Sequence, residues 1–166
     1  MSRLAPLLAS GALLLAAPAE AVTYEEARTG DGTVYIVITG PFEFRDTADG
    51  LAQVVARSGA SFVTFDSPGG NVDSAMRHGR MIRTLGLDTL QIRAADCASA
   101  CSLAFLGGVR RSAEAGSIGV HRSSFAPDFV SDPNAAVAAI QQLTAQVMSY
   151  IAEMGADPTL LSISYS

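Results

Sequence analysis

A serine and a histidine occupy positions where nucleophilic chemistry can take place. Ser99 stands in "CASAC" (97–101), at the start of a short apolar helix that the sequence predicts. His121 ends "GSIGVH" (116–121), which we expect to be a strand. A histidine can take the proton of a serine hydroxyl near neutral pH, because its unperturbed pKa is about 6.5. Each residue also has an ordinary explanation, since a serine at a helix start is often an N-cap and a lone histidine at a strand end is often packed or solvated.

Two glycines supply a further chemical feature. The stretch "SPGG" (67–70) follows the apolar run "ASFVTF" and precedes a predicted helix. Glycines there let the backbone approach a ligand closely, and amides at a helix start carry a partial positive charge. Such donors suit a developing oxyanion, and each contributes on the order of 3 kcal/mol in an acyl-transfer transition state. The plainer alternative is a strand-to-helix turn that only needs positive φ.

Alternating strands and helices must position these residues. The sequence predicts strands over 32–40, 60–66, 87–93 and 116–121, and helices over 47–59, 72–85, 99–108 and 132–154. The last helix starts with Asp132 as N-cap and carries one apolar stripe: Val137, Ile140, Leu143, Val147, Ile151 and Met154. This order predicts one α/β domain with a mainly parallel sheet, whose reactive site lies beyond the carboxyl ends of the strands.

The start of the chain has the pattern of a secretory signal peptide, residues 1–21. Arg3 is followed by an apolar run from Leu4 to Ala17, and Ala19 and Ala21 are small residues of the kind that a signal peptidase reads. The run is roughly 14 residues, against about 20 for a membrane-spanning helix. We therefore expect cleavage after Ala21 and an exported domain, periplasmic or secreted, over residues 22–166. An uncleaved anchor is the alternative.

Charge narrows the range of partners. The chain has 11 basic and 16 acidic residues, a net charge of -5 at pH 7. No basic stretch is patterned to neutralise phosphates, so we expect no nucleic-acid partner. Every basic residue is an arginine, and the chain contains no lysine. The chain therefore cannot itself supply a lysine as the general base for a serine nucleophile.

Three motifs in sequence order resemble the proteolytic subunit of the Clp protease family, in particular its exported relatives that work without an ATPase. They are "FDSPGGNVDSAMRHGRMIRTLG" (65–86), "CASACSLAFLGG" (97–108) and "GSIGVH", and the likeness extends roughly from Thr33 to Met154. The resemblance implies a crotonase-like fold of stacked ββα units and a serine peptidase that hydrolyses peptides or unfolded proteins. It also implies assembly with copies of itself, with no cofactor and no ATPase partner. Acyl-CoA enzymes share this fold, but an exported chain is poorly placed to meet coenzyme A.

Carried over residue by residue, the resemblance implies roles for particular positions. Ser99 matches the nucleophile and His121 the general base, while the backbone amides of Gly70 and Ala100 match the oxyanion hole. Gly69 supports the turn. The other histidine, His78, lies within a predicted helix and is expected to be structural.

The acidic third member of the family's triad does not carry over cleanly. Its position falls near Ser164. Asp157 is the candidate substitute, although it and Asp132 both fit helix N-caps, and Asp128 lies in a predicted loop. Loss of the orienting acid can lower turnover by about four powers of ten. Two alternatives therefore stay open: a catalytically inactive binding or scaffolding protein of the same fold, and a domain truncated at its C-terminus.

Cys97 and Cys101 flank Ser99 and form an even pair in an expected oxidising compartment. At a spacing of four in a helix, their Cα atoms would be about 6 Å apart, within disulfide reach. We expect a disulfide that clamps the turn carrying Ser99, with two free buried thiols as the alternative. A metal site would need more ligands than these cysteines and His121, so no metal is expected. A cysteine nucleophile is weakly supported, because neither cysteine matches the family's serine.

Overall fold

The computed structural model describes residues 21–121 and 132–165. One sheet has the strand order β1-β2-β3-β4-β5. The strands are β1 (Thr23–Arg28), β2 (Val34–Thr39), β3 (Phe62–Asp66), β4 (Asp88–Gln91) and β5 (Arg111–Ala113). β1 runs antiparallel to β2, and the other neighbours are parallel. The predicted α/β class and mainly parallel sheet are confirmed, whereas the stacked ββα units remain a prediction.

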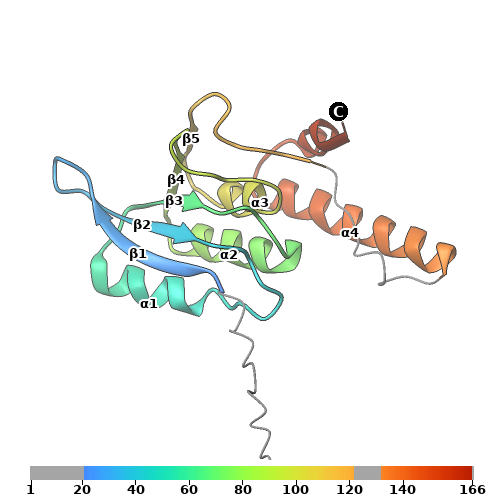
Figure 1. Cartoon of the computed structure of the whole chain (residues 1–166), viewed down its shortest axis with the longest axis horizontal. Helices are drawn as coiled ribbons and strands as arrows, with labels where there is room; N and C mark the ends of the chain where they lie inside the picture. The colour runs from blue at the N-terminus through green and yellow to red at the C-terminus, as the bar shows by residue number, and fades with distance from the viewer. Residues whose placement is uncertain (1–20, 122–131, 166) are drawn as a thin grey trace, which may run out of the picture.

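Helices are present in the four regions where the sequence predicts them. They are α1 (Asp49–Ser58), α2 (Val72–Thr84), α3 (Cys101–Leu106) and α4 (Pro133–Glu153), followed by the 3-10 helix η1 (Pro158–Tyr165). α1 and α2 lie along one side of the sheet (Figure 1). Within the described residues, no helix has the length and apolar character needed to cross a membrane.

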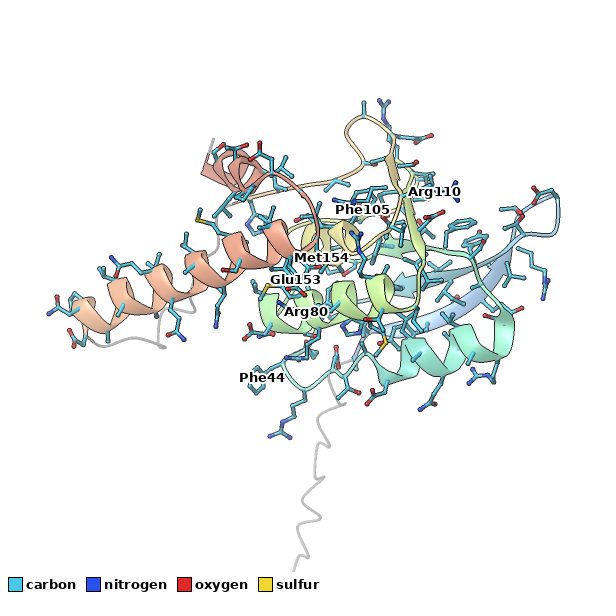
Figure 2. The ribbon with its side chains drawn as sticks, turned by 180° about the vertical axis from the view of Figure 1, so that it is seen from behind. Phe44, Arg80, Phe105, Arg110, Glu153 and Met154 are labelled. Atoms are coloured by element: carbon cyan, nitrogen blue, oxygen red, sulfur yellow. A yellow bond between two sulfur atoms is a disulfide. The ribbon has the colours of Figure 1, made fainter. Side chains whose placement is uncertain are left out.

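The C-terminal turns of α4 pack against the body, while its N-terminal half projects outward (Figure 1). Val147, Tyr150, Ile151 and Met154 are buried. The guanidinium groups of Arg83 and Arg111 donate to the carbonyl of Met154 at 3.0 and 2.8 Å. Arg80 on α2 pairs with Glu153 at 2.8 Å (Figure 2). The end of α4 is therefore fixed through both apolar and polar contacts.

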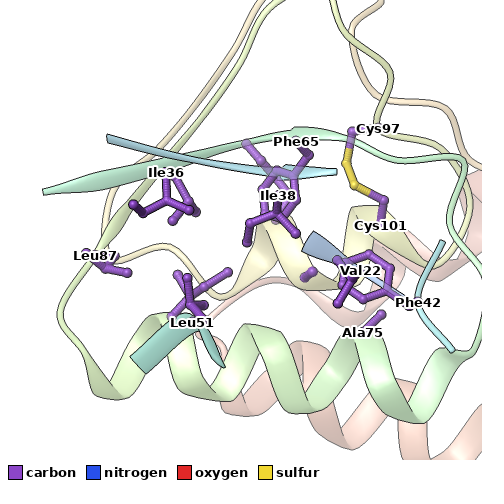
Figure 3. Packing of buried hydrophobic residues seen from close by; sticks show 14 of the residues in the cluster. Val22, Ile36, Ile38, Phe42, Leu51, Phe65, Ala75, Leu87, Cys97 and Cys101 are labelled. Carbon is purple, nitrogen blue, oxygen red and sulfur yellow. A yellow bond between two sulfur atoms is a disulfide. The ribbon is translucent and has the colours of Figure 1, made fainter. Parts of the chain in front are cut away.

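The main core lies between the sheet and the helices. Ile36 and Ile38 of β2 and Phe65 of β3 are fully buried, and they share a cluster with Leu51 of α1 and Ala75 of α2 (Figure 3). Apolar residues in the middle of the sheet are buried because a helix layer covers them. This core holds the carboxyl ends of β2 and β3 in fixed positions.

One predicted strand is wrong and two observed strands were not predicted. Residues 116–121 form a loop whose only pairing within the described residues is an isolated bridge between Gly119 and Ala98. The edge strand is β5, which has only three residues. β1 is the polar segment TYEEAR, with no buried residue and no apolar alternation to reveal it.

Candidate functional site

Three loops meet at the carboxyl ends of the strands and are joined by backbone hydrogen bonds. The amide of Ala98 donates to the carbonyl of Ser67 at 3.1 Å. The amide of Ser99 donates to the carbonyl of Gly119 at 2.8 Å, and Gly119 donates to Cys97 at 2.9 Å. The loop that carries Ser99 (97–100, the Ser99 loop) is therefore held between two segments. One is the turn 67–70 after β3 (the glycine turn), and the other is the segment 116–121 that ends at His121.

Ser99 has an unusual backbone conformation. Its φ is 55°, and it is the sole non-glycine residue with positive φ in the described ranges. Such a conformation costs roughly 1–3 kcal/mol and persists only where surrounding structure enforces it. The N-cap of α3 is Ala100, with no side-chain capping bond. Ser99 is therefore not the N-cap, and its hydroxyl is not used to cap the helix.

The amide and hydroxyl of Ser102 both donate to the carbonyl of Ser99, at 3.0 and 2.7 Å. Ser102 was not singled out from the sequence. Its position three residues after Ser99, at the start of a helix, could have indicated this side-chain-to-backbone hydrogen bond.

The predicted disulfide between Cys97 and Cys101 is confirmed. The two Cα atoms are 5.3 Å apart, and the residues are 2% and 0% exposed. Figure 3 shows the bond between the two cysteines, which precede and follow Ser99 by two residues each in the sequence. Because both cysteines are bonded, the free-thiol alternative is wrong.

The glycine turn lies directly against Ser99. Gly69 and Gly70 have φ of 100° and 124°. A Cβ added to Gly69 would lie 2.6 Å from both the Ala98 carbonyl oxygen and the Ser99 Cβ, and 2.9 Å from the Ala100 nitrogen. Only glycine fits this close approach.

Two backbone amides beside Ser99 have no hydrogen-bond acceptor. Among the residues that the structure describes, the N–H groups of Gly70 and Ala100 donate no hydrogen bond. By contrast, the N–H of Gly69 donates to Ser67 Oγ at 3.2 Å. Ala100 lines the cavity described below, whereas Gly70 is not among its lining residues, so the oxyanion-hole role of these two amides remains a prediction.

Ser99 and His121 line the same cavity, which has a volume of about 430 Å³. Most of its wall is apolar and comes from α2, α3, α4, η1 and residues 118–120. The remaining lining residues are Val72, Ala100, Ser102, Leu103, Phe105, Leu106, Ile118, Val120, Val147, Ile151, Leu160 and Leu161. No carboxylate is among these described residues. The sequence did not single out this apolar wall, because similar residues fill ordinary cores.

The candidate acids have other partners. Asp157 is exposed and accepts a hydrogen bond from the Thr159 amide at 2.9 Å, which lowers the pKa of Asp157. Asp132 accepts from the Asn134 amide at 2.9 Å and caps α4, as predicted. Asp128 lies outside the described residues. The triad role of Asp157 remains a prediction, and this residue does not line the cavity.

His78 lies away from this site and is fully buried in α2. Its Nδ1 lies 2.8 Å from the Ser74 carbonyl oxygen, so Nδ1–H donates there and Nε2 accepts from the Tyr24 hydroxyl at 2.6 Å. Burial lowers the pKa of His78 and raises the pKa of Tyr24. These contacts give His78 a structural role.

The sheet and helices form a mixed α/β fold that is similar to the fold of a solved protease, whereas the crotonase-like detail that the Clp resemblance implies remains a prediction. One solved structure with this likeness is a mutant of the 1510-N membrane-bound stomatin-specific protease, with a TM-score of 0.51 and 20% identity. The match covers 75% of this chain and 64% of that chain, so this chain spans less than two thirds of its neighbour. No protein-family model and no curated protein match the chain. At this identity the likeness is one of fold.

Proposed function

We propose that this chain is an exported serine peptidase in which Ser99 is the nucleophile and His121 the general base. The observation that supports this most is that both residues line one cavity of about 430 Å³. The unused amides of Gly70 and Ala100 add to it, and Ala100 also lines this cavity. The protease-like fold is consistent with this activity but does not establish it.

The proposed reaction proceeds in two halves. Ser99 Oγ bonds to the peptide carbonyl carbon as His121 takes the hydroxyl proton, and the amides of Gly70 and Ala100 donate to the oxyanion. His121 then protonates the leaving amine, and the C–N bond breaks to leave an acyl-enzyme. Water attacks the ester carbonyl with His121 as base, and Ser99 leaves with its proton restored.

The substrates that we propose are short or unfolded peptides, presented without an ATPase partner. The apolar wall of the cavity favours a substrate with large apolar side chains, whose burial contributes about 1.5–3 kcal/mol each.

A fluorophosphonate probe tests the nucleophile. We expect covalent labelling that mass spectrometry maps to Ser99 rather than Ser102. Ser99→Ala should abolish the labelling, and His121→Ala should slow it by at least about a hundredfold, because general-base help contributes 10²–10⁴. Ser112→Ala, on the exposed edge strand, is the control. A folded, oxidised protein that the probe does not label would instead support the binding or scaffolding alternative.

Export is proposed on the signal-peptide pattern, and the disulfide supports it because such bonds persist in oxidising compartments. Expression of the full chain in a secreting bacterium tests it. We expect the processed protein outside the cytoplasm, with Val22 as its first residue. Unprocessed protein retained in the cytoplasm would contradict the proposal.

A further inference from the structure

Val22, the residue that follows the expected cleavage point, is anchored in the core. Its side chain is only 8% exposed and lies near Phe42 and Ala75 (Figure 3). Its backbone nitrogen lies 3.4 Å from Oδ2 of Asp46. The position that becomes the amino terminus on processing is therefore already held beside a carboxylate.

Asp46 also fixes the loop that contacts the glycine turn. The same Oδ2 accepts from the Glu43 amide at 2.7 Å. In that loop, Phe42 donates to the Gly69 carbonyl at 2.8 Å and accepts from the Asn71 amide at 2.7 Å. A Cβ on Gly70 would lie 2.4 Å from the Phe42 oxygen. Backbone hydrogen bonds and close packing thus join the loop to the turn.

The charges around Asp46 favour an added cation. Arg77 donates to the carbonyls of Phe44 and Asp46, at 2.9 and 3.0 Å. No arginine of the described ranges forms a salt bridge with the Asp46 carboxylate. Asp49 adds a second negative charge nearby. The pKa of Tyr24 is raised mainly by burial and further by the charges of Asp46 and Asp49. The Tyr24 hydroxyl pairs with His78, so neither side chain supplies that cation.

We propose that cleavage after Ala21 creates an α-ammonium group on Val22 that pairs with Asp46, and that this ion pair positions the glycine turn beside Ser99. The inference rests on the proposed export, and its positioning role rests on the proposed peptidase. Hydrolysis of the Ala21–Val22 bond consumes one water and leaves a carboxylate on Ala21 and an ammonium on Val22. A neutral amide contact of 3.4 Å is long, whereas charge-assisted N–H···O bonds are about 2.7–2.9 Å. The α-amino group, with an ordinary pKa of about 7.7–8.0, is mostly protonated at pH 7.

The lack of lysine makes this ion pair directly testable. In the processed protein the α-amine of Val22 is the single primary amine, because all basic residues are arginine. Acetylation with an N-hydroxysuccinimide ester removes its charge, whereas reductive dimethylation keeps it. The protein is purified after secretion of the full chain, and its first residue is verified by sequencing. A protein that begins at another residue would overturn the proposal.

Two reaction products separate charge from added bulk. We expect native acetylation to be about tenfold slower than in Asp46→Asn, because the ion pair protects the amine. Protein acetylated in denaturant and refolded should melt about 3 °C lower and label at Ser99 about tenfold more slowly. Dimethylated protein should match the untreated protein in both measurements. In Asp46→Asn, acetylation should change neither.

Amide NMR signals separate this proposal from the peptidase proposal. Acetylation should shift the signals of Gly69 and Gly70 in a Ser99→Ala background, where no catalysis is required. Equal melting losses in the native and Asp46→Asn proteins, or unmoved glycine signals, would overturn the ion pair. If the probe labels no form of the protein while these signals shift and the melting losses differ, the peptidase proposal alone fails.

Discussion

His78 shows how one buried side chain makes stability depend on pH. Because burial lowers its pKa, the unfolded chain binds a proton below about pH 6.5 that the folded chain does not bind. Stability from the neutral imidazole is therefore complete above that pH and falls as the pH decreases below it. We expect the melting temperature to fall between about pH 7 and pH 5, and His78→Gln to flatten this fall. Thermal unfolding followed by circular dichroism checks it, and an unchanged slope in the variant would contradict it.

Gly69 provides a second prediction for a single residue. In Gly69→Ala the added Cβ would meet Ala98 and Ser99 at 2.6 Å, so the Ser99 loop must shift. We expect a loss of about 1–3 kcal/mol in unfolding free energy. We also expect at least about a hundredfold slower probe labelling, because a catalytic group displaced by about 1 Å can lose that much in rate. Denaturant titration and labelling kinetics measure the two effects.

Gly59→Ala is the matched control for Gly69→Ala. Gly59 also has positive φ, at 67°, but a Cβ there meets nothing within 4 Å. We expect a loss of about 1 kcal/mol with normal labelling. Equal slowing of labelling in both variants would show that general destabilisation, not the contact with Ser99, is responsible.

Sequence reasoning found the chemical groups but not all of their geometry. Ser99 follows β4 and His121 follows β5, which are parallel neighbours, so a common cavity is understandable, although the sequence placed the strand before His121 over 116–121 instead of 111–113. The positive φ of Ser99 was not predictable, because tertiary hydrogen bonds to Gly119 and the bulk of neighbouring loops impose it. The sequence likewise cannot show that the N–H groups of Gly70 and Ala100 donate no hydrogen bond, because this depends on the three-dimensional contacts of the described residues.

Among the elements, the helices were easier to predict than the edge strands. α2 and α4 have caps and apolar stripes that are local properties of the sequence. β5 has three residues, and its neighbour β4 rather than its own composition makes it a strand. Residues 116–121 have strand-like composition, yet Gly119 bonds with the Ser99 loop and Ser117 bonds with Glu114 and Gln91. Whether these segments form strands therefore depends on their hydrogen-bonding partners more than on the strand propensity of their own residues.

α2 and α3 approach one another at glycines, and Tyr150 of α4 closes this contact. A Cβ on Gly107 would lie 2.2 Å from the Gly79 oxygen, and the Tyr150 hydroxyl occupies the space beside Gly79. That hydroxyl donates to the Leu103 carbonyl at 2.7 Å. The docking of α4 therefore includes one part-buried hydrogen bond as well as apolar packing.

Tyr150→Phe and Glu153→Gln compare a buried with an exposed contact of α4. Tyr150→Phe should lower the unfolding free energy by about 1–3 kcal/mol, because it leaves the part-buried Leu103 carbonyl without the donor that the fully buried Tyr150 supplies. Glu153→Gln removes a salt bridge whose side chains are 46% exposed, and should cost at most about 1 kcal/mol. Denaturant unfolding measures both. A larger loss of unfolding free energy for Glu153→Gln than for Tyr150→Phe would contradict our expectation that the Tyr150–Leu103 hydrogen bond contributes more than the salt bridge.

At the scale of the whole molecule, the apolar stripe of α4 divides into two parts. Val147, Ile151 and Met154 are buried within the chain, whereas Val137 and Ile140 are 53% and 49% exposed. The sequence alone left open whether the stripe serves the core of a monomer or contacts with other copies. The structure assigns its C-terminal half to the core, and within the described residues the projecting half belongs to neither core cluster (Figure 1).

We therefore predict that the N-terminal half of α4 mediates self-association. Ile140→Glu should weaken association at least tenfold, because an interface would have to desolvate the new carboxylate, and about 1.4 kcal/mol suffices for that factor. Gln141→Glu adds the same charge at the next exposed position and should have a smaller effect. Sedimentation velocity over a concentration series measures the association of each form. A native protein that sediments as a monomer throughout, or equal losses in the two variants, would contradict a contact through this face of α4.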